Sequence, residues 1–189
     1  MSRIELILGC MFSGKTTELI RRISRYHSIG APVLCINHSS DSRTKEYNSI
    51  QSHEGRSIPA VKTNELMSLV STLKFETAKV IGIDEAQFFG DLVEFVKYAE
   101  YAKKIVFICG LDGDYQRKPI GQILQCIPLC DSVVKLTAYD MIDKDGTPAI
   151  FTHLNCQDDA PESHILVGGE DKYTAVSRAN YLRLNKHTA

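Results

Sequence analysis

A loop near the N-terminus carries residue types that bind phosphate. The segment Gly9-Cys-Met-Phe-Ser-Gly14-Lys15-Thr16 has the spacing G-x-x-x-x-G-K-[ST], in which the glycines let backbone N–H groups turn toward phosphate oxygens. The ammonium of Lys15 would reach the β- and γ-phosphates of a nucleoside triphosphate, and the hydroxyl of Thr16 is a hard oxygen ligand for Mg²⁺. The pattern predicts phosphate binding by Gly9, Met11, Phe12, Ser13, Gly14, Lys15, Thr16 and Thr17.

Two adjacent carboxylates follow an apolar run later in the chain, in the segment Val80-Ile-Gly-Ile-Asp84-Glu85. In proteins with such a phosphate loop, an Asp at the end of a strand holds Mg²⁺. We predict this role for Asp84. We expect Glu85 to lie beside the γ-phosphate as a general base that orients a hydroxyl nucleophile and takes its proton. The alternative is that Glu85 caps the next helix or is merely solvated.

Apolar runs alternate with helical patterns in the part of the chain that must position these groups. Strands are predicted at residues 4–8, 32–36, 80–83, 105–109 and 133–136. One helix is predicted at residues 16–28, and the spacing of Leu66, Leu69, Val70 and Leu73 predicts another. Residues 38–58 are polar and aperiodic, which predicts a loop.

A third helix is predicted after residue 91. Asp91 and Glu94 have the spacing of a capping box, in which the two side chains satisfy backbone N–H groups at a helix N-terminus. The core face of this helix is predicted to be Leu92, Phe95, Val96, Ala99 and Ala102.

The order of these elements predicts an α/β fold. Continuous apolar strands separated by helices are typical of a parallel sheet covered on both faces. We predict a P-loop, RecA-like sheet flanked by helices over residues 1–137. Residues 138–189 are predicted to form a small lobe of short strands and a C-terminal tail, with a hairpin turn at Asp145-Gly146.

Composition excludes several classes of function. The net charge is -1, from 22 basic and 23 acidic residues, so the basic excess typical of nucleic-acid-binding proteins is absent. The sequence lacks the roughly 20 consecutive apolar residues of a membrane span, and the apolar run at its start is too short for a signal peptide. Six scattered cysteines without a C-x-x-C pair predict reduced thiols in a cytoplasmic protein.

Four segments together resemble the type II thymidine kinase family. They are GCMFSGKTTEL at residues 9–19, IDEAQFF at 83–89, GLDGDYQRKP at 110–119 and VGGEDKYTAV at 167–176, and the resemblance extends from about Ile4 to Tyr181. It implies ATP-dependent transfer of the γ-phosphate to the 5′-hydroxyl of thymidine, and of deoxyuridine as well, with Mg²⁺ as cofactor. It also implies a homotetramer or dimer that is inhibited by the end product dTTP.

The resemblance assigns roles to matching residues. Glu85 corresponds to the catalytic base, and Asp41 and Arg43 resemble an element that contacts phosphates and metal, with Gln87 added to the ATP-binding set. Arg117 lies in the segment near the acceptor site. The predicted nucleoside-binding residues are Met11, Phe88, Leu111, Tyr115, Thr152, Val167, Gly168, Gly169 and Tyr173.

The chain departs from the family where members usually carry a structural zinc held by two C-x-x-C pairs. Those positions are Asp140, Asp143, Ser177 and Asn180 here, and these side chains are poor zinc ligands. We therefore predict that structural zinc is absent and that packing alone holds the lobe. The predicted apolar cluster is Tyr139, Ile142, Pro148, Ile150 and Phe151.

Three other readings stay open at this point. Cys126, Cys130, His153 and Cys156 could replace the lost zinc ligands, although buried thiols and a surface imidazole are favoured. The whole chain could be a catalytically weak or regulatory nucleotide-binding P-loop protein, or a P-loop ATPase acting on nucleic acid or protein. The phosphate loop and the acidic pair are intact, and the charge is neutral overall, which favours the kinase.

Overall fold

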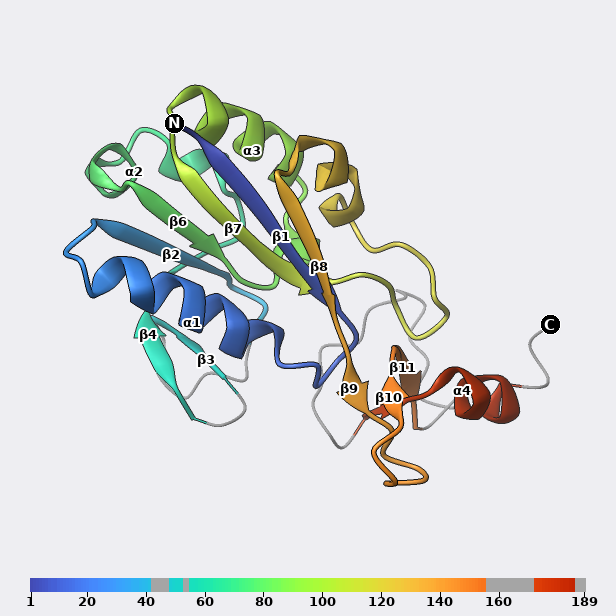
Figure 1. Cartoon of the computed structure of the whole chain (residues 1–189). Coiled ribbons are helices and arrows are strands. Elements are labelled where there is room, and N and C mark those ends of the chain that lie inside the picture. The colour runs from blue at the N-terminus through green and yellow to red at the C-terminus, as the bar shows by residue number, and fades with distance from the viewer. Residues whose placement is uncertain (42–47, 53–54, 156–171, 186–189) are drawn as a thin grey trace.

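The centre of the molecule is a six-stranded sheet in the order β5-β2-β6-β7-β1-β8 (Figure 1). The structure is a computed structural model that describes residues 1–41, 48–52, 55–155 and 172–185. Neighbouring strands in this sheet run parallel, as predicted. The strands are β1 Arg3–Gly9, β2 Val33–His38, β5 Val61–Thr63, β6 Val80–Ile83, β7 Ile105–Leu111 and β8 Ser132–Leu136.

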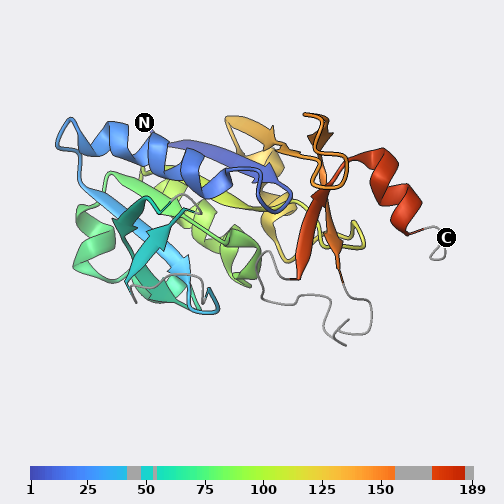
Figure 2. The same cartoon turned by 90° about the horizontal axis from the view of Figure 1, so that it is seen from below.

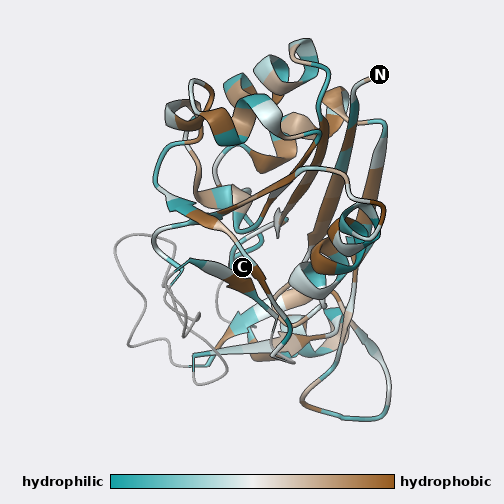
Figure 3. Ribbon diagram, turned by 90° about the vertical axis from the view of Figure 1, so that its left-hand side faces the viewer, coloured by the Kyte–Doolittle hydropathy of each residue, from teal (hydrophilic) through white to brown (hydrophobic). Residues whose placement is uncertain are grey.

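Helices cover both faces of the sheet (Figures 1 and 3). On one face, α1 (Lys15–His27) packs Leu19, Ile20 and Ile23 against Ile7 of β1 and its neighbours. On the other face, α3 (Leu92–Tyr101), α2 (Leu73–Thr77) and the 3₁₀ turns η1 (Met67–Leu69), η2 (Ala86–Phe88) and η3 (Ile123–Leu129) lie against the sheet. Successive side chains of a strand point to opposite faces, so both faces of these apolar strands are buried.

Two of the predicted helical features are wrong. Leu66 to Leu73 is not one helix, because η1 ends at Leu69 and α2 begins only at Leu73 after an extended Thr72 that accepts a hydrogen bond from the Phe75 N–H. The capping box is also absent: Asp91 precedes α3, but its Oδ2 accepts from the Met67 N–H at 2.7 Å instead. The predicted core face of α3 is otherwise confirmed, except that Ala102 is exposed just past its C-terminus.

The segment predicted as a loop at residues 38–58 contains structure that the sequence pattern did not indicate. Strands β3 (Ser49–Gln51) and β4 (Ser57–Pro59) pair antiparallel, and Ile50 is fully buried under α1. Strand β5 follows directly and joins the main sheet beside β2. Three-residue strands are too short to show an alternating pattern, which explains why they were missed.

A small lobe, here residues 138–155 and 172–185, lies beyond the carboxyl ends of the sheet strands (Figure 2). Strands β9 (Ala138–Tyr139) and β10 (Pro148–Ala149) form the predicted hairpin, with Gly146 at a φ of 89° in its turn. Strands β11 (Phe151–Leu154) and β12 (Tyr173–Val176) pair antiparallel, and α4 (Arg178–Leu184) follows.

The apolar cluster predicted for the small lobe is wrong. Tyr139 is 70% exposed and Ile142 is 41% exposed, and Pro148 is exposed as well. The buried apolar residues of the lobe are instead Ala138, Ala149, Leu154, Tyr173, Ala175, Val176 and Tyr181. Cys10 and Phe12 of the phosphate loop pack against the three alanines. None of the largest fully buried side chains of the described residues lies in the lobe, so its apolar packing is weaker than that of the sheet.

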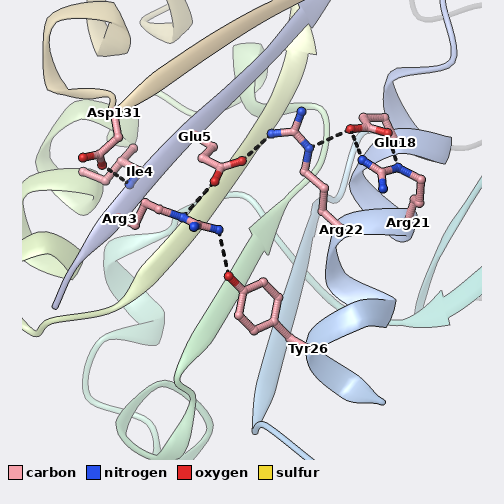
Figure 4. A network of polar contacts seen from close by, with 8 residues as sticks. All are labelled: Arg3, Ile4, Glu5, Glu18, Arg21, Arg22, Tyr26 and Asp131. Carbon is pink, nitrogen blue, oxygen red and sulfur yellow. Dashed lines mark hydrogen bonds and ion pairs between the residues drawn. The ribbon is translucent and has the colours of Figure 1, made fainter. Parts of the chain in front are cut away.

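A network of charged side chains links β1 to α1 (Figure 4). Glu5 of β1 forms ion pairs with Arg3 and Arg22, and Arg22 also contacts Glu18 within the helix. Arg21 donates a further pair of hydrogen bonds to Glu18. The network fixes the helix against the strand from which the phosphate loop leaves, so both ends of that loop are held.

Two further sequence predictions concern the state of the cysteines and the absence of a membrane-spanning segment. Cys10, Cys35, Cys109 and Cys126 are buried free thiols and Cys130 is half-buried and free, as predicted; Cys156 lies outside the described residues. Within the described ranges, no helix has both the length and the apolar character needed to cross a membrane.

Candidate active site

The phosphate loop leaves the sheet at Gly9 and enters α1 at Lys15, so its backbone lies at a helix N-terminus. Gly9 is required sterically, because a Cβ there would lie 2.5 Å from Ser13 Oγ and 2.6 Å from the Leu136 carbonyl oxygen. The Ser13 hydroxyl and the Lys15 ammonium both donate to the Cys10 carbonyl, at 2.8 and 2.6 Å. These two hydrogen bonds close the loop around the Cys10 carbonyl and keep the Lys15 ammonium beside it.

Thr16 and Asp84 come together, as the sequence predicts. The Thr16 hydroxyl donates to Asp84 Oδ2 at 3.0 Å, which joins the first turn of α1 to the end of β6. A hydroxyl and a carboxylate at this edge are oxygen donors of the kind that Mg²⁺ prefers. The donor set thus fits the magnesium ion that the family resemblance implies.

Glu85 is a buried carboxylate held in an unusual backbone conformation. Its exposed fraction is 8%, and its φ of 51° is in the left-handed region that non-glycine residues rarely adopt. Backbone strain of this kind is found most often at functional sites. Its N–H donates to Asp84 Oδ1 at 3.0 Å, so one contact fixes the two adjacent carboxylates relative to each other.

Gln87 has a clear structural role that sequence reasoning missed. It was predicted to bind ATP, but its amide donates to Glu85 Oε2 at 2.6 Å and accepts from the Leu111 N–H at 3.1 Å. A Cβ on Gly110 would lie 2.3 Å from the Gln87 amide oxygen, so glycine is needed there. The amide therefore ties Glu85 to the end of β7 and orients it.

Asp41 is anchored near the carboxyl end of β2. Asn37 donates to Asp41 Oδ2 at 2.9 Å, and the Lys62 ammonium donates to the Asp41 carbonyl at 2.7 Å. Neither Asn37 nor Lys62 was singled out from the sequence. A polar Asn37-His38 pair at the end of the apolar strand β2, which lies beside β6, is the signal that could have found the first. Arg43 lies outside the described residues.

His38 and two phenylalanines form an aromatic group next to Glu85. The ring of His38 lies 5.5 Å from that of Phe88 and 4.8 Å from that of Phe89. Burial lowers the pKa of His38 below its usual value, although Glu85 and Asp91 act to raise it. The imidazole is therefore neutral at pH 7 and presents an apolar face beside Phe88.

The nucleoside-binding residues predicted from the resemblance come from both parts of the molecule. The Met11 N–H donates to the Thr152 hydroxyl at 3.1 Å, which joins the phosphate loop to β11 of the small lobe. The Cys10 thiol likewise contacts the Ala149 carbonyl, at 3.4 Å. Tyr173 is buried at the start of β12, paired with Leu154.

Tyr115 lies in a loop with two supports. Within the loop, Asp114 Oδ1 accepts hydrogen bonds from the N–H groups of Gln116 and Lys118, both at 2.8 Å. From the lobe, the Tyr181 hydroxyl donates to the Tyr115 carbonyl at 2.8 Å. Three further predicted residues, Val167, Gly168 and Gly169, lie outside the described residues.

Comparison with known proteins gives one consistent family. The family model described as "Thymidine kinase" matches residues 2–181. The chain is 43% identical to "Thymidine kinase a" of Arabidopsis thaliana over 184 residues, covering 95% of this chain and 74% of the relative. It is 40% identical to "Thymidine kinase" of Yaba monkey tumor virus over 182 residues and 39% identical to that of vaccinia virus (strain Western Reserve) over 179 residues. These matches cover 96% and 95% of this chain and 96% of each viral relative.

Proposed function

Because the chain belongs to the thymidine kinase family, we propose that it transfers the γ-phosphate of ATP to the 5′-hydroxyl of thymidine, giving thymidine monophosphate for nucleotide salvage. The observation that supports the proposal most strongly is the contact between Thr16 and Asp84 at 3.0 Å, with Glu85 directly beside it. Phosphate loop, metal ligands and general base then occupy one end of the sheet, as phosphoryl transfer requires.

In the proposed reaction the 5′-oxygen of thymidine bonds to the γ-phosphorus while the bond to the β–γ bridging oxygen breaks, and ADP leaves. Glu85 accepts the proton of the attacking hydroxyl, and Gln87 holds Glu85 in position for this. Lys15 and the loop N–H groups bind the phosphates and neutralise their charge. Mg²⁺ held by Thr16 and Asp84 would supply further charge neutralisation when bound.

Nucleoside recognition is assigned to residues at the junction with the small lobe. Met11, Phe88, Leu111 and Tyr115 would pack against the base, and Thr152 would contact its edge. The segment that includes Val167, Gly168 and Gly169 and leads to Tyr173 would bind the base through its backbone. Asp41 and Arg43 would contact the phosphates.

Further properties are proposed from the same family membership. They are use of deoxyuridine, feedback inhibition by dTTP, a homotetrameric or dimeric assembly, a cytoplasmic location and a division of the chain between residues 137 and 138. The absence of structural zinc stays a prediction: the described residues contain no cluster of three or more His, Cys, Asp or Glu side chains that could hold a metal, but Cys156 lies outside them.

A steady-state kinase assay tests the proposed function. Thymidine, deoxyuridine, deoxycytidine and deoxyguanosine are compared with Mg²⁺ and ATP, using Glu85→Gln as the control that keeps the shape of the site and removes the base. We expect turnover of thymidine by the wild-type protein and a loss in the variant. Tight ATP binding without turnover of any nucleoside would instead support a regulatory nucleotide-binding protein.

A further inference from the structure

The small lobe contains a buried carboxylate at the centre of a polar cluster. Asp140, in the loop after β9, is 1% exposed. Its Oδ1 accepts hydrogen bonds from the N–H groups of Ile142 and Asp143, at 2.8 and 3.1 Å. Its Oδ2 accepts from the Ser177 N–H and from the Asn180 side-chain amide, the latter at 3.0 Å. One carboxylate thereby joins the β9–β10 turn to the start of α4.

Asn180 extends the cluster to a second carboxylate. Its amide nitrogen also donates to Asp143 Oδ2 at 2.7 Å, so a neutral NH₂ group lies between two acidic side chains. The opposite orientation of the amide would place its oxygen against both carboxylates and is excluded by repulsion. The Ser177 hydroxyl accepts from the Asn180 N–H at 3.3 Å and caps α4.

The electrostatics indicate that the Asp140 carboxylate is charged and hydrogen-bonded at both of its oxygens. Burial acts to raise the pKa of Asp140, but the hydrogen bonds from Asn180, Ser177 and Asp143 outweigh it and hold that pKa well below its usual range. Asp140 is therefore ionised at neutral pH. A buried carboxylate is costly unless donors satisfy it, and here each oxygen has such donors.

These four residues stand where the family resemblance expects zinc-binding cysteines, but they do not fit zinc. Structural zinc requires four nitrogen or sulfur donors, with a carboxylate at most as an occasional ligand. The Ser177 N–H and the Asn180 NH₂ both donate hydrogen bonds to Asp140. Neither group therefore offers a lone pair to a cation at the centre of the cluster. The four positions converge through hydrogen bonds and need no metal ion to do so.

The cluster lies at the start of a connected path to the candidate nucleoside site. Ser177 directly follows β12, which pairs with β11 so that Ala175 is opposite Thr152. On α4, the ring of Tyr181 lies 5.0 Å from that of Phe151, and its hydroxyl donates to the Tyr115 carbonyl. Displacing the start of α4 would therefore shift both Thr152 and Tyr115.

We propose that Asp140, Asp143, Ser177 and Asn180 form a metal-free hydrogen-bonded latch, with Asp140 as a positioning residue that holds β12 and α4 and so sets the affinity for the nucleoside. The phosphate loop is held at both ends by β1 and α1, and its hydrogen bonds to the lobe go to Ala149 and Thr152 and not to α4, so the latch acts more on thymidine than on ATP. The kinetic part of this proposal rests on the proposed thymidine kinase activity; the structural part does not.

The test combines substitution with three readouts. Asp140→Asn keeps the shape of the side chain but turns a donor NH₂ group toward Ser177 or Asn180. The matched control is Asp145→Asn in the same turn, because the Asp145 carboxylate is exposed and bonds the Thr147 N–H within that turn. The readouts are zinc content by elemental mass spectrometry, amide hydrogen exchange, and KM for thymidine and for ATP.

We expect the wild-type protein to contain far less than one zinc per chain. In Asp140→Asn we expect KM for thymidine to rise by about tenfold, since unpaired buried donors result, while KM for ATP stays within about twofold. Amide exchange should accelerate in β11, β12 and α4 and stay unchanged in β1, β6 and β7. The Asp145→Asn variant should resemble the wild-type protein in all readouts.

Where Asp140→Asn does not fold, Asn180→Ala tests the same latch more gently, because it removes only the bonds to Asp140 and Asp143. Stoichiometric zinc, unchanged exchange in the lobe, or equal loss of protection in the sheet and the lobe would each overturn the latch. If wild-type protein does not phosphorylate thymidine, the proposed function fails, whereas the exchange and zinc readouts still decide the latch.

Discussion

The central sheet and the small lobe are held together by different chemistry. Between the sheet and its helices lie large, fully buried side chains, among them Phe89, Phe95 and Phe107. The lobe buries three alanines that pack against Cys10 and Phe12, together with Leu154, Tyr173, Val176 and Tyr181, and none of these is among the largest fully buried side chains. Burial free energy grows with apolar area, so the lobe gains much less from it than the sheet does. Buried, hydrogen-bonded carboxylates occur in both regions, Asp84 and Glu85 at the end of β6 and Asp140 in the lobe, so Asp140 contributes a larger share of the stabilisation where apolar burial is smaller.

The two regions also differ in where their polar networks lie and in what those networks consist of. Glu18 and Glu5 on the sheet side are paired with arginines near the surface (Figure 4). Asp140 in the lobe is buried and bonded mostly to neutral N–H groups. Ion pairs near the surface are weak and screened by salt, whereas buried hydrogen bonds to a carboxylate are not. We therefore expect loss of the sheet-side network to destabilise the protein less than loss of the Asp140 hydrogen bonds.

The largest expected effect is on the rate of catalysis and leaves the stability of the protein nearly unchanged. Glu85→Gln should lower kcat by about 10²–10⁴-fold, the usual contribution of a general base, and leave the thermal unfolding temperature nearly unchanged. Steady-state kinetics and a melting curve on the same preparation measure both. A variant that keeps its kcat would mean that Glu85 is not the base.

The next effect compares the two regions by core truncation. Phe95→Ala should lower the free energy of unfolding by about 3–5 kcal/mol, because it leaves a cavity beneath α3. Phe151→Ala in the lobe should cost only about 1–2 kcal/mol, since its ring is half-buried against Tyr181. Urea unfolding gives both values. Equal costs would mean that the half-buried ring of Phe151 contributes as much packing as the fully buried ring of Phe95.

A single hydrogen bond between the regions gives a smaller effect. Thr152→Val removes the acceptor for the Met11 N–H while keeping the shape of the side chain. We expect KM for thymidine to rise by about fivefold to tenfold, from the cost of one unsatisfied buried donor. Thr152→Ser, which keeps the hydroxyl, is the matched control and should stay close to the wild-type value. A rise in Thr152→Ser without one in Thr152→Val would point to the methyl group instead.

The smallest effect concerns the surface network. Hydrogen bonds from Arg21 lower the pKa of Glu18 to about 2, with Arg22 contributing and partial burial opposing. Because the folded pKa is depressed, this stabilisation is complete above the ordinary value of 4.5 and is lost as pH falls through about 2. Glu18→Gln should cost no more than about 1 kcal/mol at pH 7 in low salt.

That difference should shrink in about 1 M salt, where the Debye length is only about 3 Å, and should also shrink below pH 4.5. Urea unfolding of the variant and the wild-type protein at two salt concentrations checks this. A cost that is independent of salt would mean that Glu18 contributes through packing.

The sequence was most informative where a pattern is long or chemically specific. The strands of the sheet and the contact of Thr16 with Asp84 were predicted because apolar runs and the phosphate-loop spacing leave few alternatives. The three-residue strands around Ile50 and Ile58 carry no such pattern. Asp91 was misassigned because the Met67 N–H, distant in sequence, competes for its carboxylate.

The lobe was predicted least well for a physical reason. The sequence predicts Tyr139 and Ile142 as members of its apolar cluster, but both lie at the surface. The residues that join its segments, Asp140 and Asn180, are polar and are 40 positions apart, so their contact exists only in the folded chain. The contacts of Gln87 with Glu85 and Leu111 were missed for the same reason, since Leu111 lies on another strand, and its role toward ATP stays a prediction.

The most direct test of the account is thymidine phosphorylation by wild-type protein from which zinc has been removed with a chelator, assayed with added Mg²⁺. The account predicts that kcat and KM for thymidine equal those of untreated protein, and that adding zinc changes neither. Loss of thymidine turnover on chelation, restored by zinc, would contradict a lobe held by Asp140 and its hydrogen-bond donors.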